Sequence, residues 1–181
     1  MLVSGFSPIG NHQSRLLILG SLPGQLSLEK QEYYAHPQNG FWSIMGALFG
    51  AGAQRPYHER VERLLAQGVA VWDVCQEAIR PGSLDANIVS HSVIANDFVQ
   101  FFVAHPNIQL IAFNGAAAQQ QYKRLVVPTL TDQFKKCPEI ILPSTSPTHA
   151  ALSLKDKLQQ WSVLKKKLAQ FAVPPSSLIN M

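Results

Sequence analysis

The sequence contains few cysteines: its 181 residues include two, Cys75 and Cys137. Two thiols are too few for a disulfide framework, or for an iron–sulfur or zinc cluster held by four thiolates. We interpret both as buried free thiols. The cysteine count therefore excludes a domain that depends on disulfide bonds for its stability.

Charged residues and long apolar runs are also scarce. Only 14% of the residues are charged and 46% are hydrophobic, whereas about 25% are charged in an average soluble protein. This composition supports a packed core rather than a disordered tail. No apolar run reaches the roughly 18–20 residues of a membrane span, and the N-terminus lacks the order of a secretory signal. We therefore expect a cytoplasmic protein with no membrane partner, in which residues 1–181 form a single domain.

Acidic residues are rare in the last third of the chain. Residues 1–120 carry 6 Lys and Arg against 8 Asp and Glu, whereas residues 121–181 carry 9 against 3. Lys and Arg near phosphates release counterions, so this basic segment is compatible with a nucleic-acid partner. A solvated helix face explains the same charges, and charge alone favours that interpretation.

Four short, nearly continuous apolar runs predict strands that are buried on both faces, as in a parallel sheet. They cover Leu16–Leu19, Val69–Val74, Ile108–Phe113 and Glu139–Leu142. The intervening stretches favour helices at Phe41–Phe49, Tyr57–Ala66, Asp97–Ala104 (after an Asn96 cap) and Ala116–Leu125. The alternation predicts the α/β class: a three-layer α/β/α sandwich with a central four-stranded, mainly parallel sheet.

The last predicted helix has the clearest pattern. Apolar residues recur at spacings of three and four from Leu154 to Phe171, with Lys on the other face. Ser153 is its expected cap, and Pro174-Pro175 is expected to end it.

Loops rich in Gly, Pro and small polar residues follow all four predicted strands. The loops contain Gly20–Gly24, Asp73, Asn114-Gly115 and Pro143–His149. Because ligands bind beyond the carboxyl ends of parallel strands, these loops are expected to meet at one site. The first loop lacks the Gly-Lys-Ser/Thr ending of a P-loop, and no Gly-x-Ser-x-Gly elbow surrounds Ser21. An NTPase and a serine esterase are therefore disfavoured.

The segment from Tyr33 to Trp42 is denser in aromatic and amide groups than a connecting loop needs. Aromatic faces stack on nucleic-acid bases, and an Asn side chain reads a base edge or holds a water. We assign such roles to Tyr34 and Asn39, whereas Trp42 is expected to pack the following helix.

These motifs together resemble those of the DNA-deoxyinosine glycosylases, the sixth family of the uracil-DNA glycosylase superfamily. The resemblance rests on ILGSLPG (residues 18–24), YYAHPQN with FW (residues 33–42), VWDV with Arg80 and GSLD (residues 71–85), FNG (residues 113–115) and LPSTSP (residues 142–147). It spans Arg15 to about Trp161. Taken jointly these motifs are specific, whereas any one of them alone is weak.

The resemblance implies a monofunctional hydrolase that flips a deaminated base, hypoxanthine or uracil, out of DNA and cleaves its N-glycosidic bond with water. Asn39 then positions the water. Ser21 occupies a place where relatives carry an acidic residue or Asn, and it cannot act as a carboxylate base. Tyr34 matches the position of an aromatic ring that stacks on the flipped base. The implied base pocket comprises Gly20, Leu22, Pro23, Gly24, Tyr34, Phe41 and Asn114.

Asn114 and the loop after the fourth strand leave alternatives open. Asn114 either reads a base edge or serves as a turn residue, and we weigh the two readings equally. The resemblance implies that Ser144, Thr145, Ser146, Pro147 and Thr148 contact DNA. The basic balance of residues 121–181 leads us to expect further DNA contacts at Lys155 and Lys157. The family usually has Ser-Pro-Ala-Asn in the loop after the fourth strand, whereas here Ser146-Pro147 is followed by Thr148-His149. His149 then either donates to the base or is a surface residue, and Asp73 and Asp85 are expected to be loop anchors.

We expect no metal and no organic cofactor, because the motifs supply neither a ligand cluster nor a Schiff-base lysine. The expected partner is double- or single-stranded DNA that contains a deaminated base, bound by a monomer. Two alternatives stay open: an α/β enzyme acting on a free nucleoside or nucleotide, and an inert binder of damaged DNA.

Overall fold

A computed structural model describes residues 1–171 of the chain. Its central sheet has the strand order β3-β2-β6-β7, and all neighbouring strands are parallel. The strands are β2 (Leu16–Gly20), β3 (Val69–Asp73), β6 (Leu110–Asn114) and β7 (Glu139–Leu142). The predicted four-stranded parallel sheet is therefore confirmed, and the third predicted strand moves two residues toward the C-terminus at its start.

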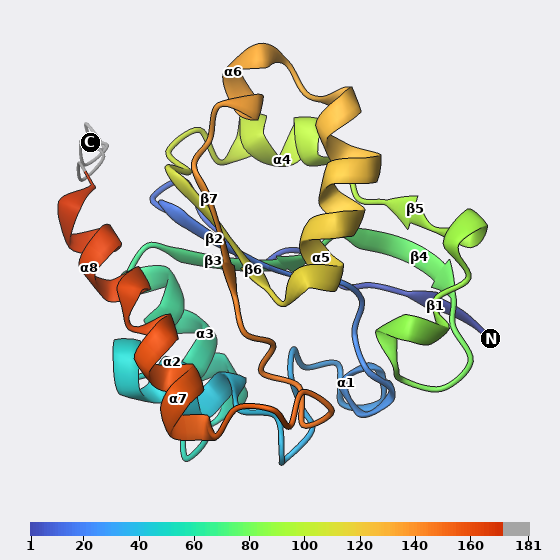
Figure 1. The fold of residues 1–181 in the computed structure, drawn as a ribbon. Helices are drawn as coiled ribbons and strands as arrows, with labels where there is room; N and C mark the ends of the chain where they lie inside the picture. The colour runs from blue at the N-terminus through green and yellow to red at the C-terminus, as the bar shows by residue number, and fades with distance from the viewer. Residues whose placement is uncertain (172–181) are drawn as a thin grey trace.

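Helices cover both faces of this sheet, which gives the predicted three layers (Figure 1). On one side lie α2 (Phe41–Phe49), α3 (Tyr57–Ala66), α7 (Leu154–Trp161) and α8 (Val163–Gln170). On the other lie α4 (Phe98–Ala104), α5 (Ala116–Gln121) and the short α6 (Asp132–Lys135). β2 is fully buried and β6 is buried up to Asn114, because their side chains meet helices on both faces.

A second, antiparallel sheet has the order β1-β4-β5 and was not predicted. It consists of β1 (Leu2–Ser4), β4 (Cys75–Ile79) and β5 (Ile94–Ala95). Its strands bury one face around Val3, Cys75 and Ala78, so they lack the continuous apolar run that identified the central strands. The chain passes from β3 into β4 through Val74, which the sequence pattern had assigned to the strand before it.

Several predicted helix boundaries were wrong. Asp97, not Asn96, caps α4: its carboxylate accepts a hydrogen bond from the Gln100 N–H at 3.0 Å. The helix predicted at Ala116–Leu125 ends as α5 at Gln121 and continues as a π-helix at Tyr122–Val126. Two short segments, α1 (Gln25–Lys30) and a 3₁₀ turn at Asp85–Asn87, were not predicted and follow the Gly20–Gly24 and Gly82–Asp85 loops.

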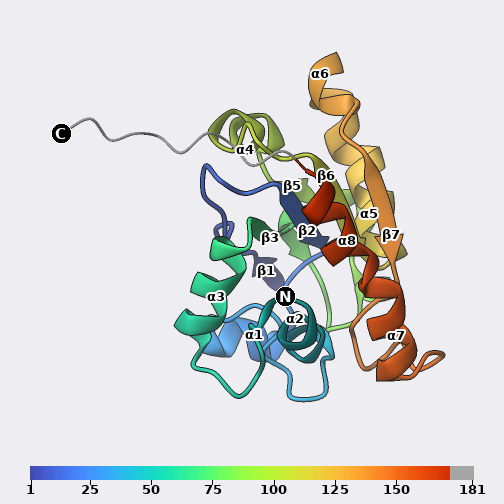
Figure 2. The same ribbon diagram turned by 90° about the vertical axis from the view of Figure 1, so that its left-hand side faces the viewer.

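The last predicted helix is two helices. Ser153 caps α7 as expected, within a capping box completed by Asp156. The helix ends at Trp161, where the Ser162 hydroxyl donates to the Gln159 carbonyl and α8 begins after it. The predicted stop at Pro174-Pro175 lies outside the described residues, and α8 ends at Gln170. In Figure 2, α7 and α8 run beside β7 along one edge of the fold. Within residues 1–171 no helix is both long and apolar enough to cross a membrane.

Candidate active site

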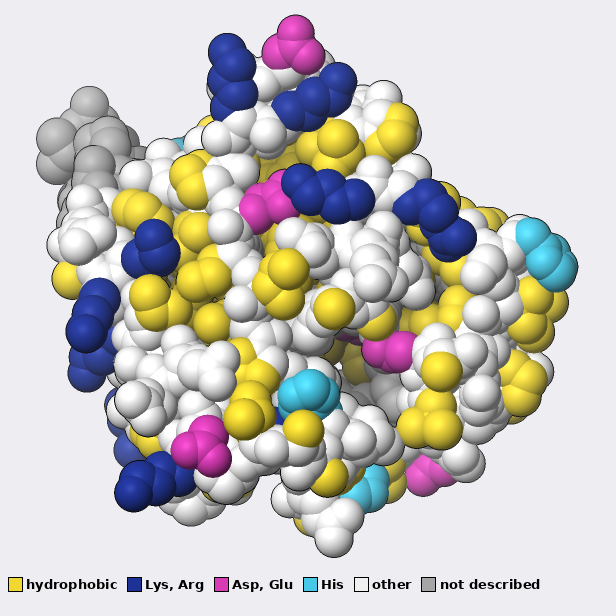
Figure 3. All heavy atoms as spheres, viewed as in Figure 1, with side chains coloured by type: hydrophobic (Ala, Val, Ile, Leu, Met, Phe, Trp, Pro, Cys, Tyr) yellow, Lys and Arg dark blue, Asp and Glu magenta, His cyan; other side chains and the backbone are white. Residues whose placement is uncertain are grey.

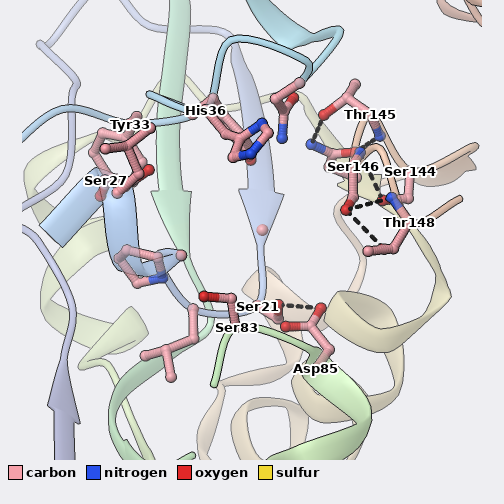
Figure 4. Close-up of a pocket in the computed structure, with 18 of the residues that line it drawn as sticks. Ser21, Ser27, Tyr33, His36, Ser83, Asp85, Ser144, Thr145, Ser146 and Thr148 are labelled. Atoms are coloured by element: carbon pink, nitrogen blue, oxygen red, sulfur yellow. Dashed lines mark hydrogen bonds between the residues drawn. The ribbon is translucent and has the colours of Figure 1, made fainter.

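A hollow of about 330 Å³ lies at the carboxyl ends of the parallel strands, where the end of β3 meets the loops after β2, β6 and β7 and the segment after β4. Figure 3 shows a depression in this face with an acidic side chain at its margin, and Figure 4 shows the residues that line it. The structure brings these predicted site residues to it: Gly20, Ser21, Leu22, Pro23, Gly24, Tyr34, Asn39, Asn114, Ser144, Thr145, Ser146, Pro147 and Thr148. The convergence of four loops places the site where strand topology predicts a ligand.

Tyr34 forms an aromatic wall of this hollow. One face of its ring stacks on Phe41, with ring centroids 3.9 Å apart and planes inclined by 20°. Its backbone has a φ of +55°, a conformation that side chains rarely adopt, so the ring is held where the chain turns sharply. Phe41 itself is fully buried and does not line the hollow. The prediction of Phe41 as a pocket residue is therefore corrected: its ring packs behind Tyr34 and against Trp42.

At the floor of the hollow, the Asp73 and Tyr34 side chains can lie against the β2 backbone only because residue 20 is glycine. A side-chain atom at Gly20 would collide with the carboxylate of Asp73 and with the hydroxyl of Tyr34. Gly20 pairs directly with Asp73 in the register of β2 and β3. Gly24 differs, because an added methyl group there would meet no atom within 4 Å. Close packing therefore requires glycine at position 20 but not at position 24.

Asp73 is a buried carboxyl group at the bottom of the site. The residue is 4% exposed, and its Oδ2 atom and the Tyr34 hydroxyl are buried without a hydrogen-bond partner. Burial, reinforced by the negative charge of Asp85, raises the pKa of Asp73 to about 7, while Arg80 opposes the rise. The Asp73 carboxyl group is thus partly protonated near neutral pH.

Ser21 and Asp85 form a second polar group at the hollow (Figure 4). The Ser21 hydroxyl donates to Asp85 Oδ2 at 2.6 Å, and Arg80 Nη1 lies 3.9 Å from Asp85 Oδ1. Desolvation raises the pKa of Asp85, whereas the Ser21 hydrogen bond and the Arg80 charge lower it. Arg80 is almost fully buried and also donates to the Leu22, Pro23 and Gly82 carbonyls. It therefore joins the loop after β2 to the loop that carries Asp85.

Asn39 lines the hollow immediately before α2. Its Oδ1 accepts a hydrogen bond from the Phe41 N–H at 3.0 Å, which fixes the direction of the amide. A carbonyl oxygen has a second lone pair, and the amide nitrogen has two donors. The Asn39 side chain can therefore hold a water while its position is fixed by the helix start.

Asn114 lines the hollow and is hydrogen-bonded through both ends of its amide to the loop after β7. Its Nδ2 donates to Thr145 Oγ1 at 2.9 Å, and its Oδ1 accepts from the Thr145 N–H at 2.8 Å. Thr145 is 1% exposed, and its carbonyl accepts from the Gly40 N–H at 2.9 Å. In this geometry, Asn114 anchors a loop, and Thr145 ties that loop to the segment carrying Asn39.

The remaining predicted DNA contacts separate into two groups. Ser146 and Thr148 lie at the edge of the hollow, joined by a 2.8 Å contact between their hydroxyls. Lys157 is buried, and its ammonium donates to the Ser146 carbonyl at 3.3 Å. The expectation that Lys157 faces DNA is therefore wrong, because its buried ammonium group binds the loop backbone instead. Lys155 is exposed.

His149 does not reach the hollow. Its side chain is exposed, and its N–H donates to the Ser146 carbonyl within a turn. The structure instead adds His36, Ser83, Asp73 and Asp85 to the lining. The sequence presented both aspartates as loop anchors. Asp73 could have been identified as a lining residue by its place at the carboxyl end of β3, where ligands bind, whereas Asp85 follows β4 of the sheet that was not predicted.

Three comparisons with known proteins agree with this geometry. A family model described as the uracil DNA glycosylase superfamily matches residues 7–167. A hypoxanthine DNA glycosylase of Methanosarcina barkeri (strain Fusaro / DSM 804) is 37% identical over 116 residues, which are 64% of this chain and 72% of the relative. A second one, from Methanosarcina acetivorans, is 35% identical over 119 residues, 65% of this chain and 74% of the relative.

A solved structure has the same fold. It is a solution NMR structure of a proposed uracil DNA glycosylase from Methanosarcina acetivorans, with a TM-score of 0.76 and 30% identity. The match covers 93% of this chain and 99% of the other.

Proposed function

The chain belongs to the uracil DNA glycosylase superfamily, and from this premise we propose that it is a DNA repair glycosylase that removes hypoxanthine from DNA. The substrate follows from the two Methanosarcina relatives, which are named hypoxanthine DNA glycosylases. The enzyme extrudes the damaged nucleotide from the helix, hydrolyses its N-glycosidic bond and leaves an abasic site. Uracil is the second base that we expect it to accept.

The observation that carries this proposal is that Tyr34 and Asn39 line the same hollow of about 330 Å³. Ligand pockets span roughly 300–1,000 Å³, so a hollow at the lower end suits one nucleotide rather than an extended ligand. The Tyr34 ring offers a flat surface on which a flipped base stacks, and Phe41 holds that ring from behind.

Asn39 positions the attacking water. The oxygen of this water attacks C1′ as the bond between C1′ and the base nitrogen breaks, and the bonding electron pair leaves with the base. Because the Phe41 N–H fixes the amide of Asn39, the water is held without reorganisation during the reaction. The hydroxyls of Ser146 and Thr148 lie at the edge of the hollow, where we expect DNA backbone contacts.

The test uses duplexes that carry one hypoxanthine, uracil or xanthine, and it measures alkali-labile abasic sites under single turnover. The proposal expects hypoxanthine to be released fastest. Faster cleavage of free deoxyinosine than of the duplex would instead favour a nucleoside-processing enzyme. Tight binding of the inosine duplex with no abasic product would favour an inert binder of damaged DNA.

A further inference from the structure

Cleavage of a glycosidic bond leaves positive charge on the sugar as the base departs with its electron pair. An oxocarbenium-like sugar is stabilised by a negative charge fixed near C1′. Asn39, which positions the water, is neutral. The hollow must therefore contain another group if this charge is to be balanced by the protein.

Two acidic side chains line the hollow among residues 1–171: Asp73 and Asp85. They differ in accessibility. Asp73 is 4% exposed and lies beneath Gly20, behind the surface that a substrate would touch. The Asp85 side chain is 39% exposed, so its carboxylate can face a sugar directly.

Burial raises the pKa of the Asp85 carboxyl, and two neighbouring groups oppose this rise. The Ser21 hydroxyl donates to Oδ2 at 2.6 Å, and the buried Arg80 guanidinium lies 3.9 Å from Oδ1. Both groups stabilise the ionised form of a carboxyl. In Figure 4, Ser21 and Asp85 lie together with their bond, on a side of the hollow away from Tyr33 and Ser27. Arg80 and Ser21 thus hold the Asp85 carboxylate in one orientation.

An exposed carboxylate on a surface that binds DNA repels phosphates, so its presence there calls for a compensating role. Asp85 also has a structural role as an acidic partner of the buried Arg80, but that role alone does not require a side chain that is 39% exposed at the hollow. Ser21 carries no charge, but its hydroxyl orients the carboxylate of Asp85, which lies in a different loop.

We propose that Asp85 is a catalytic residue of this enzyme: held by Ser21, its carboxylate faces the sugar of the flipped nucleotide and stabilises the positive charge that develops at C1′. This inference rests on the proposed glycosylase function. In the balanced step, water adds its oxygen to C1′, the base leaves with the electron pair, and Asp85 accepts the proton that the water loses. The base takes up a proton from solvent.

The decisive test is binding, not turnover. The full chain is titrated with two duplexes that carry an abasic analogue at the same position: a cationic pyrrolidine and a neutral tetrahydrofuran. A charge-assisted contact contributes about 1.5–3 kcal/mol, so wild type is expected to prefer the cationic analogue by about 10- to 100-fold. Asp85→Asn should abolish most of this preference, while binding of undamaged duplex stays unchanged or improves.

Matched variants separate the charge from other effects. Glu62→Gln removes an equal charge from an exposed position on α3, outside the hollow, and should keep the preference. Asp85→Glu keeps the charge one methylene away, so it should retain much of the preference even though excision slows. In single-turnover excision, Asp85→Asn should be slower than wild type by about 10²–10³.

The proposal and the glycosylase function fail in different ways. A wild type that releases no base refutes the glycosylase function, and the binding preference still tests Asp85. A preference for the cationic analogue that survives in Asp85→Asn overturns the role of Asp85. Loss of binding to all duplexes together with a lowered urea midpoint in both Asp85 variants also overturns it, because the residue would then be structural.

Discussion

Replacing Asp73 with Asn should make the protein more stable at alkaline pH. The Asp73 carboxyl is buried beneath the active site, its Oδ2 has no hydrogen-bond partner, and burial raises its pKa from 3.8 to about 7. Asn has nearly the same shape and carries no charge at any pH. The substitution therefore removes the cost of ionising a buried acid while leaving the packing in place.

The magnitude follows from proton linkage. Below about pH 4, Asp73 is protonated in both the folded and the unfolded chain and costs nothing. As the pH rises from about 4 to 7, the unfolded chain releases this proton while the folded chain retains it, so the free energy of unfolding falls. Above pH 7 the full penalty applies, and a pKa raised from 3.8 to about 7 corresponds to about 4 kcal/mol. This value is an upper bound for the gain in Asp73→Asn.

Urea unfolding at pH 4 and at pH 8 measures the difference. At pH 8, Asp73→Asn is expected to be more stable than wild type by about 2–4 kcal/mol, and at pH 4 the two should agree within about 1 kcal/mol. Asp132→Asn is the matched control, because that side chain is 91% exposed, and it should change stability equally at both pH values. A difference between Asp73→Asn and wild type that is independent of pH would refute the reasoning.

Four further predictions concern catalysis, DNA binding and stability. Asn39→Ala should bind an inosine duplex almost as well as wild type and release the base about 10²–10³ times more slowly under single turnover, and an unchanged rate would contradict its role. Lys155→Ala should reduce the slope of log K against log salt by about 1, whereas Lys157→Ala should leave that slope unchanged and lower the urea midpoint. Asn114→Ala should lower the free energy of unfolding by about 1–3 kcal/mol, because it leaves the buried Thr145 N–H without its acceptor. Excision should continue in a chelator and should produce no strand break before alkali treatment, which gel electrophoresis tests.

The central sheet could be predicted from the sequence because its strands are buried on both faces. The run Leu16–Gly20 is apolar at nearly every position, and only a doubly covered strand has that pattern. By contrast, Cys75–Ile79 buries only one face of a small sheet, and its short alternation does not distinguish a strand from a loop. The break at Ser162 also escapes the pattern, because apolar spacing continues across it.

The loop motifs identified the neighbourhood of the site, but not the partners of each side chain. Asn114 illustrates the limit: its position after β6 was predicted, yet its amide is paired with Thr145, a residue 31 positions away. Phe41 was assigned to the base pocket from its motif and Lys157 to DNA contact from the local charge balance, whereas the structure buries both. Burial in three dimensions decides such assignments, and spacing in the chain does not encode it.

The hydrogen bonds of Thr145 have a consequence for how damaged DNA is captured. Asn114 and Gly40 both form hydrogen bonds with this one buried residue. These bonds join the end of β6, the start of α2 and the loop after β7 into one unit. The loop after β7 cannot move away from the end of β6 or the start of α2 without breaking these hydrogen bonds. Another wall of the hollow is the Ser83–Asp85 segment, which is held by contacts from Ser21, Gln25 and Arg80. The nucleotide must therefore rotate into a hollow whose one side is fixed by the hydrogen bonds of Thr145 before DNA binds.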